Sequence, residues 1–565
     1  MTNILISDTK SGHKTATING IKLHSAYDPI KECERSISEL SIGKANLLIV
    51  SGIALGYHIL EISKRFPNTS ILAIDYSSEI INYAQEFNRL SSLGITCVSN
   101  KEDAINFIEL LDLEKFTGLA HYIHRPSHGL NPEFYDSIVS DCSKLISSRI
   151  SDLLTRFEFE EKWVENIFLN VPKLSKGFAI SNLFNKFKSM PGIIVSAGPS
   201  LKKNIKLLKN INDKALILAV DTAFPVLRKH NIVPHLVMTL DAQKFSIKHF
   251  LGQYNTNTAL IADLVSCPSI IRDFKGTIFF STTSKIAYTD MGECLRETTP
   301  AVDWLEKFIL PVGDIQSGGS VATNAFDVLL NLGCNPIILV GQDLAYTGRE
   351  MHSTGTYHND GWIPTCSRFL NLDTINQNII RKRKISRVPA YGNERNERNE
   401  TAITDFILTL YRTWFENSSK IVPVKVINAT EGGAKIENTI EMSLQDVIDS
   451  MSQKKSPVEI INNIKTNHIN NKNISTGIKN ALSTAEELEK IVNAKSDINL
   501  YEQTYNILEQ FETESLYRPL LRKANLYIAR KSFNESDTNN IMKAELPRII
   551  NKIKPILEKC LSALK

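Results

Sequence analysis

Short apolar runs alternate with amphipathic segments through the middle of the chain. Each run finishes in a small or acidic polar residue, and the runs span residues 192–197, 214–222, 234–241, 259–263 and 277–282. Buried strands separated by helical segments are typical of a parallel sheet that helices cover on both faces. The pattern therefore predicts a Rossmann-like, mostly parallel α/β domain.

The strand at 192–197 leads directly into the turn Ala197-Gly198-Pro199-Ser200. Apolar residues at helical spacing follow, which predicts a helix over 201–209 with Ser200 as its N-cap. The first N–H groups of a helix have no partner within it and can bind an anion. The turn thus predicts a phosphate-bearing ligand, although packing alone also accounts for many turns of this composition.

Polar residues at the ends of other strands extend this prediction. Asp221 and Asp241 each end an apolar run, and a later strand ends in Gln342-Asp343. In open α/β sheets the ligand lies outside the carboxyl ends of the strands. Helix capping would explain one such residue but not the series. The turn Ser317-Gly318-Gly319 begins a helix predicted to run through Leu332 and offers a second anion-binding terminus.

A polar, glycine-bearing loop follows Asp343 and carries His352 and His358. Active-site lids often have this composition. Residues 380–400 are highly charged, so we predict a solvated or disordered loop, with contact to an acceptor as the lesser alternative. A helix over 401–416 and a strand over 422–428 are predicted next.

The N-terminal region reads as a second Rossmann-like unit. A hairpin is predicted at Asn19-Gly20, and a strand at 46–50 precedes a glycine turn and a strand ending in Asp75. Such a βαβ unit binds adenosine cofactors in some folds. The middle glycine of that motif is missing here, so we favour a scaffold used for recognition or packing.

Three histidines at 121, 124 and 128 raise the possibility of a metal site. Pro126 and Gly129 interrupt any helix that would align them, and the cluster contains no acid or cysteine. We therefore predict loop histidines. From Pro132 to Lys188 the pattern is helical, with Trp163, Ile167 and Asn170 on one face.

Taken together, the fold class is multidomain α/β with an α-helical C-terminal domain. We predict an N-terminal Rossmann-like domain, a helical connector, a central α/β domain and a C-terminal helical domain, at residues 1–130, 131–190, 191–440 and 441–565.

Composition and charge limit the number of domains, the kind of partner and the cellular compartment that we expect. The 565 residues are too many for one core, and 65 basic against 61 acidic residues leave a net charge of +4, so no nucleic-acid partner is expected. The eight cysteines form no Cys-x-x-Cys pair, which favours free thiols in a reducing compartment. With neither a signal-peptide pattern nor an apolar run of ~20 residues, a cytoplasmic protein is expected.

Six short motifs occur in order along the central region. They are Ser-Ala-Gly-Pro-Ser-Leu, Val-Asp-Thr-Ala, Thr-Leu-Asp, Gly-Gly-Ser-Val-Ala, Gly-Gln-Asp-Leu-Ala-Tyr and Asn-Ala-Thr-Glu-Gly-Gly-Ala, starting at residues 196, 220, 239, 318, 341 and 428. As a set they resemble the bacterial motility-associated factor (Maf) flagellin glycosyltransferases. The similarity covers most of the chain and includes Leu-Gly-Tyr at 55–57 and the helix at 163–170.

The resemblance implies transfer of a nonulosonic acid, of the pseudaminic or legionaminic type, from its CMP donor to Ser or Thr of flagellin. That modification would be needed for flagellar assembly and motility. Flagellin and the CMP-sugar would be the partners, and an oligomer is compatible with the sequence.

The central region also resembles bacterial CMP-sialic-acid transferases that share a Gly-x-Gly-Pro-Ser-Leu turn. Ala197, Asp221 and Asp241 stand where those enzymes have asparagines, so their contacts do not transfer atom for atom. By this resemblance the donor-binding residues would be Ala197, Gly198, Pro199, Ser200, Asp221, Thr222, Asp241, Ser317, Gly318, Gly319, Gln342, Asp343 and Glu431.

The same resemblance places a catalytic histidine in the lid after Asp343, and we favour His352 over His358. It would act as the general base of an inverting displacement, because an imidazole titrates near neutral pH. The chain has no Asp-x-Asp pair and CMP carries one phosphate, so no metal or other cofactor is expected to be obligatory.

Two alternatives come from other functional classes. The central region resembles 6-hydroxymethylpterin pyrophosphokinase-like proteins, which would use ATP and Mg²⁺ for diphosphate transfer. A non-catalytic protein that binds or chaperones flagellin is the third hypothesis.

Overall fold

The described residues form two compact units. The computed structural model describes residues 4–113, 115–211, 213–253, 257–288, 294–392, 400–452, 455–464, 471–494, 499–531 and 535–565. The first unit comprises Met1–Glu158 with Lys523–Asn534, and the second comprises Phe159–Arg522 with Glu535–Lys565.

The first unit begins with a three-stranded antiparallel sheet of β1 (Ile4–Asp8), β2 (Lys14–Ile18) and β3 (Ile21–Lys22). The hairpin predicted at Asn19-Gly20 is confirmed: Ile18 pairs with Ile21, and both turn residues have positive φ, at 50° and 81°. Asn-Gly favours this turn because both residues tolerate a left-handed backbone.

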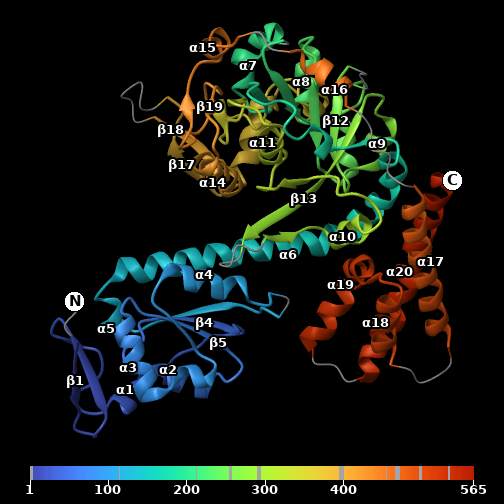
Figure 1. Cartoon of the computed structure of the whole chain (residues 1–565). Helices are drawn as coiled ribbons and strands as arrows, with labels where there is room; N and C mark the ends of the chain where they lie inside the picture. The colour runs from blue at the N-terminus through green and yellow to red at the C-terminus, as the bar shows by residue number, and fades with distance from the viewer. Residues whose placement is uncertain are drawn as a thin grey trace. The chain divides into compact units, whose positions relative to one another are not determined.

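A four-stranded parallel sheet follows in the order β6-β5-β4-β7. Its strands are β4 (Leu47–Ser51), β5 (Ser70–Ile74), β6 (Thr96–Val98) and β7 (Leu119–Ile123). Figure 1 shows strands β4 and β5 with helices beside them. Apolar side chains of α1 (Pro29–Ser38), α2 (Tyr57–Arg65) and α3 (Ser78–Asn88) pack on one face. Those of α4 (Lys101–Glu109) and of the first turns of α6 (Pro132–Leu174) pack on the other. The predicted Rossmann-like scaffold is therefore confirmed.

The second unit contains a large, mostly parallel sheet, also as predicted. Along its main path the strands run β14-β13-β12-β11-β10-β9-β16-β19-β20, and only β14 pairs antiparallel. The strands are β9 (Gly192–Val195), β10 (Leu216–Val220), β11 (Leu236–Thr239), β12 (Ala259–Asp263), β13 (Ile278–Tyr288), β14 (Cys294–Glu297), β16 (Ile337–Val340), β19 (Val426–Asn428) and β20 (Ile440–Glu441), with β8 (Phe178–Ala179) and β15 (Asp314–Gln316) paired to β13.

The strand order reverses at β9, because β10 to β13 extend to one side and β16, β19 and β20 to the other. β9 is buried throughout and pairs in parallel with both β10 and β16. A reversal of this kind leaves a crevice at the carboxyl ends of the central strands. The sheet topology thus creates a place for a ligand.

Helices and helical turns surround this sheet. They are η2 (Ile180–Leu183), α7 (Leu201–Asn204), η3 (Ile205–Asn210), α8 (Phe224–Lys229), η4 (Lys244–His249), α9 (Pro268–Asp273), α10 (Pro300–Glu306), α11 (Val321–Leu332), η5 (Thr347–Arg349), α12 (Tyr357–Trp362), η6 (Ile363–Thr365), α13 (Leu372–Arg381), α14 (Phe406–Ile421), α15 (Leu444–Asp449) and α16 (Pro457–Asn462).

The structure corrects three local predictions. The helix predicted over 201–209 is α7, which ends at Asn204, followed by the 3-10 turn η3. In the charged segment 380–400, β17 (Ile385–Pro389) pairs with β18 (Thr401–Asp405), while residues 393–399 lie outside the described residues. The helix predicted from residue 401 begins at Phe406, because Asp405 accepts a hydrogen bond from Leu408 N–H and caps α14 there.

The helix α6 carries the residues predicted to share one face, and its buried amides anchor it within the second unit. Asn170 Nδ2 donates to Leu264 O and Ser266 O, each at 2.9 Å. Asn166 one turn earlier donates to Ala242 O and Val265 O. The two amides together thus satisfy loop carbonyls that follow β11 and β12.

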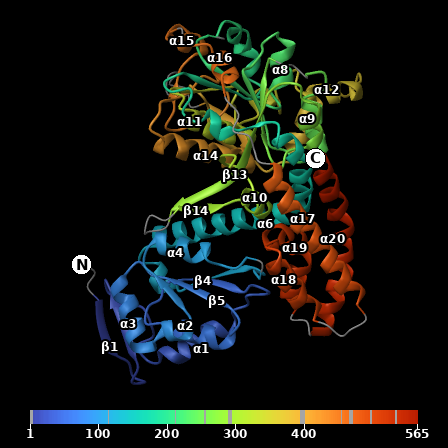
Figure 2. The same cartoon turned by 45° about the vertical axis from the view of Figure 1, so that its right-hand side comes forward.

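The C-terminal part is helical, as predicted (Figure 2). It consists of α17 (Asn471–Asn493), α18 (Leu500–Gln510), α19 (Glu514–Lys531) and α20 (Glu535–Leu564). Within the second unit, Arg522 pairs with Glu160 on α6, and Arg548 pairs with Glu161 at 2.9 Å. Among the described helices, none is long and apolar enough to cross a membrane.

Candidate functional site

A cavity of about 420 Å³ opens at the carboxyl ends of β9, β10 and β16, where the strand order reverses. A volume in this range suits a small-molecule ligand. Of the predicted site residues it is lined by Ala197, Gly198, Pro199, Asp221, Thr222, Gln342, Asp343 and His352.

The turn after β9 is shaped by Asp343. The carboxylate of Asp343 is 2% exposed and accepts hydrogen bonds from Ser200 N–H at 3.1 Å and Ser200 Oγ at 2.6 Å. A Cβ on Gly198 would lie 2.5 Å from Gly341 O and 2.7 Å from Asp343 Cγ. Glycine is therefore required at 198 because the β16 loop approaches so closely.

This arrangement overturns the expected role of Ser200 as a side-chain N-cap. Ser200 makes no capping hydrogen bond, since its hydroxyl donates to Asp343 instead. The N–H that the turn offered to an anion already binds this internal carboxylate. Burial raises the pKa of Asp343, and the hydrogen bonds from Ser200 oppose that rise.

Two further predicted residues are held in networks beneath the cavity. Asp221 accepts from Thr222 N–H at 2.7 Å and from Thr239 Oγ1 at 2.9 Å. Gln342 accepts from Ser196 Oγ at 2.5 Å. These contacts fix the side chains before any ligand arrives, which lowers the cost of binding.

The remaining predicted residues do not line the cavity. Asp241 follows β11 on an exposed stretch and accepts from Gln243 N–H. Glu431 accepts from Leu444 N–H at 2.9 Å and Asn204 Nδ2 at 3.3 Å. The predicted turn Ser317-Gly318-Gly319 immediately precedes Ser320, the first residue of this segment that lines the cavity. A Cβ on Gly318 would lie 2.5 Å from the Trp414 ring. Packing explains that glycine.

The residues that directly follow this turn do reach the cavity. Ser320 caps α11, and Ser320, Val321 and Ala322 line the wall. In the part of the chain that the structure describes, the N–H groups of Val321 and Ala322 have no hydrogen-bond acceptor. The twelve-residue α11 therefore presents the positive end of its dipole to the cavity.

The sequence pattern did not predict that an arginine lines this cavity. Arg383 lines the cavity, and its Nη1 lies 3.6 Å from Asp405 Oδ2, which also accepts from Tyr346 Oη at 2.6 Å. Asp405 is 4% exposed. The basic run at 381–384 was the available signal, but its charge pattern could not distinguish a solvated loop from a cavity wall.

His352 lies at the cavity wall and is held there through its neighbours. Ser353 N–H donates to Ala197 O at 2.8 Å, and Asn359 Nδ2 donates to His352 O at 3.0 Å. The rings of His352 and His358 stack with centroids 4.9 Å apart, and the His249 ring centroid lies 5.5 Å from that of His358.

Burial, with a smaller effect of His358 and His249, lowers the pKa of His352 to about 4. His352 is therefore neutral at physiological pH. His358 does not line the cavity.

The first unit does not leave its Rossmann-type turn open. A Cβ on Gly52, which has φ of 96°, would meet Ser127, and the Asp75 carboxylate accepts from Ile53 N–H at 2.8 Å and Ser77 N–H at 3.2 Å. Asp75 is 1% exposed, so these contacts occupy the carboxylate that would bind a ribose.

The prediction that the histidines at 121, 124 and 128 lie in a loop holds for His124 but is wrong for the other two. His121 is on β7, which pairs with β4, and His128 is in the short helix α5 (Arg125–His128). His124 precedes α5 and is buried. His121 contacts Ser51 Oγ at 2.8 Å and His128 contacts Asp136 at 3.0 Å. Helix breakers in the local sequence hid the strand pairing.

Comparison with known proteins bears on the second unit first. Residues 165–349 match the family model described as 6-hydroxymethylpterin diphosphokinase MptE-like. Two uncharacterized proteins of Treponema pallidum (strain Nichols) are 24% identical over 350 residues and 20% identical over 234 residues. The alignments cover 59% and 39% of this chain, which spans 58% and 59% of those relatives.

The whole chain is also similar to a solved structure. The MAf glycosyltransferase from Magnetospirillum magneticum AMB-1 superposes with a TM-score of 0.60 at 13% identity, covering 100% of this chain and 93% of that one. The resemblance noted from the sequence motifs is therefore confirmed at the level of the fold. The chain has the fold of a Maf glycosyltransferase, with an MptE-like part at residues 165–349.

Proposed function

We propose that the chain is a glycosyltransferase that moves a nonulosonic acid from a CMP donor to a Ser or Thr hydroxyl of flagellin. The observation that carries the proposal is the cavity at the strand reversal, which combines a helix N-terminus, an arginine and a neutral histidine. The Maf glycosyltransferase fold supports the reaction class, and the motif resemblance supports the donor and acceptor.

The donor phosphate belongs at the wall formed by α11 and Arg383. The N–H groups of Val321 and Ala322 and the guanidinium of Arg383 are the positive groups there. The turn at Ser200 does not offer the same contact, because its N–H already donates to Asp343. A phosphate held at α11 gains both hydrogen bonds and the favourable helix dipole.

Transfer would proceed by inverting displacement. As the acceptor hydroxyl oxygen bonds to the anomeric carbon, the bond from that carbon to the phosphate oxygen breaks and CMP departs with the electron pair. His352 accepts the hydroxyl proton. Its pKa of about 4 keeps a lone pair available at neutral pH, and a positioned base contributes ~10²–10⁴ in rate. Arg383 and α11 stabilise the charge on the departing CMP.

The test compares purified wild type with His352→Ala, supplied with CMP-nonulosonic acid and recombinant flagellin. Wild type should release CMP and increase the intact mass of flagellin by whole sugar residues. His352→Ala should lose ~10²-fold or more in rate while keeping its circular dichroism spectrum. His230→Ala is the matched control, since His230 contacts Val226 O at the end of α8 and does not line the cavity. Full transfer by His352→Ala would refute the base assignment.

A second candidate function is favoured by the MptE-like match at 165–349. A pterin diphosphokinase would transfer diphosphate from ATP with Mg²⁺. Turnover of ATP and a hydroxymethylpterin, with no CMP release from the sugar donor, would establish it in place of glycosyl transfer. Flagellin binding with neither reaction would instead indicate the non-catalytic alternative.

A further inference from the structure

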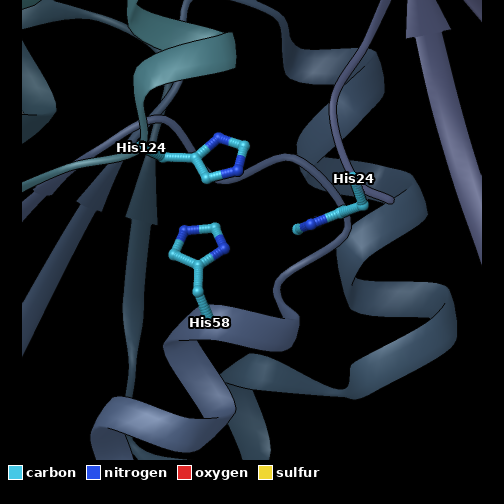
Figure 3. Close-up of side chains that lie close together, drawn as sticks. All are labelled: His24, His58 and His124. Carbon is cyan, nitrogen blue, oxygen red and sulfur yellow. The ribbon is translucent and has the colours of Figure 1, made fainter. Parts of the chain in front are cut away.

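Three buried histidines converge in the first unit, and none of them lines the cavity of the second unit. They are His24 after β3, His58 in the first turn of α2 and His124 after β7. Their exposed fractions are 3%, 0% and 8%, and one ring nitrogen from each lies within 4.8 Å of the others. Figure 3 shows the three side chains side by side, with the rings of His58 and His124 face to face and the His24 ring directed toward them. We propose that His24, His58 and His124 bind a divalent transition metal of the Zn²⁺ class.

The contacts of the His58 ring are those of a metal-ligating histidine. His58 Nε2 contacts Gly52 O at 3.0 Å, which directs the proton to that nitrogen. Its Nδ1 is fully buried and has no hydrogen-bond partner among the described residues. A ligating histidine usually donates its other N–H to an oxygen in this way. The orphaned nitrogen of His58 is therefore the strongest sign of a missing ligand.

Unlike His58, the other two rings have a contact at each nitrogen. His24 Nδ1 lies 3.8 Å from the Glu32 carboxylate, and His124 Nδ1 lies 2.8 Å from Ser127 Oγ. Both rings also make contacts that metal binding would replace: Leu55 N–H donates to His24 Nε2 at 3.3 Å, and the His124 ring donates a hydrogen bond to the backbone of Leu23. The 3.3 Å bond is long and weak. Cys33 Sγ is 4.0 Å from His24 Nδ1, on the Glu32 side, so it is not the next ligand.

Binding requires one local rearrangement. The rings of His58 and His124 are stacked at 4.4 Å with an interplanar angle of 6°. Lone pairs lie in the ring planes, so parallel rings cannot both point at one ion. Zinc needs Zn–N distances of about 2.0–2.1 Å, and one of the two rings must therefore rotate toward the centre. A water molecule would complete a tetrahedral site.

The site would fasten separate parts of the first unit. His24 directly follows the three-stranded sheet, whereas His58 and His124 belong to the parallel-sheet scaffold. A metal bound by all three would hold the N-terminal hairpin on that scaffold. Since the ligand set exists only in the folded chain, binding free energy adds to folding stability. The metal is thus structural and independent of the proposed transfer reaction.

The experiment uses the full-length untagged chain, stripped with chelator and then dialysed against Zn²⁺ or Co²⁺. Wild type should retain one equivalent of metal by mass spectrometry, give the visible absorption of tetrahedral Co²⁺ without a thiolate band, and unfold at a higher temperature with Zn²⁺ than without it. His58→Asn and His124→Asn should retain none and show no stabilisation. His121→Asn, on β7 three residues before His124 and outside the cluster, should behave as wild type.

A milder variant protects the test against misfolding of the core substitutions. Glu32→Gln removes the carboxylate near His24 at a side chain that is 43% exposed, and should weaken zinc binding about 10–100-fold. Sub-stoichiometric metal in the wild type would overturn the proposal. So would retention unchanged by His58→Asn, or a strong thiolate–Co²⁺ band.

Discussion

The Gly198→Ala substitution tests whether the turn after β9 is shaped by Asp343. The new Cβ would lie 2.5 Å from Gly341 O and 2.7 Å from Asp343 Cγ, closer than real Cβ atoms approach. Gly341 O accepts from Gly198 N–H at 2.8 Å, and Asp343 is held by Ser200, so neither neighbour can move freely. Overpacking costs about 1–3 kcal/mol, and loss of a hydrogen bond to the carboxylate adds about 1.5–3 kcal/mol. The second unit should lose about 3–5 kcal/mol of unfolding free energy.

Urea unfolding followed by tryptophan fluorescence measures this loss. Gly361→Ala is the matched control, because its Cβ would have ordinary contacts beginning at 3.6 Å and it lies in α12 without a positive φ. That variant should be neutral or slightly stabilised. In an Asp343→Ala background, Gly198→Ala should cost less, with a coupling of about 1 kcal/mol or more. A Gly198→Ala protein as stable as wild type would refute the account and would favour a glycine kept only for ligand approach.

Two further predictions concern the cavity. The acid limb of kcat/KM should lie near pH 4, the value to which the pKa of His352 is lowered, because the base works only when unprotonated. His358→Ala removes a stacked ring and a neighbouring positive charge, so the pKa of His352 should rise and that limb should move to higher pH. Transfer rates measured between about pH 4 and 8 test this, and an unchanged profile would contradict it. Arg383→Gln should weaken CMP binding by roughly tenfold or more, as loss of a charge-assisted contact implies. Arg387→Gln, on β17 and outside the cavity lining, should not weaken it. If calorimetry gave the wild type and Arg383→Gln equal affinities for CMP, the phosphate would have to bind elsewhere.

Much of the fold could be read from the sequence because its signals are local. Strands such as 192–195 and 216–220 are continuous apolar runs that only a sheet covered on both faces can bury. The Asn19-Gly20 hairpin was predictable for the same reason, since its backbone angles suit those two residues. Where a segment's structure depended on a distant partner, prediction failed: Thr401–Asp405 forms a strand because Ile385–Pro389 pairs with it.

The candidate site shows the same division. Sequence pattern identified the strand-end residues Gly198 and Asp343, and the family resemblance added His352 in the following loop; the structure brings all three to one cavity. It could not tell that Asp343 binds Ser200 and so occupies the anion position of that turn. Nor could it place Arg383, because a basic run looks alike on a solvated loop and on a cavity wall.

By itself, the sequence determined the parallel α/β class, the helical C-terminal part and the order of the polar strand ends, because each is encoded by periodicity within a short stretch. Tertiary structure alone decided which of those polar groups remain available to bind a ligand. The reversal of strand order at β9 places the Asp343 carboxylate against Ser200 and leaves the α11 terminus facing the cavity. It also brought together His24, His58 and His124, which are separated by 34 and 66 residues, since packing of the hairpin and scaffold depends on contacts that no local pattern records.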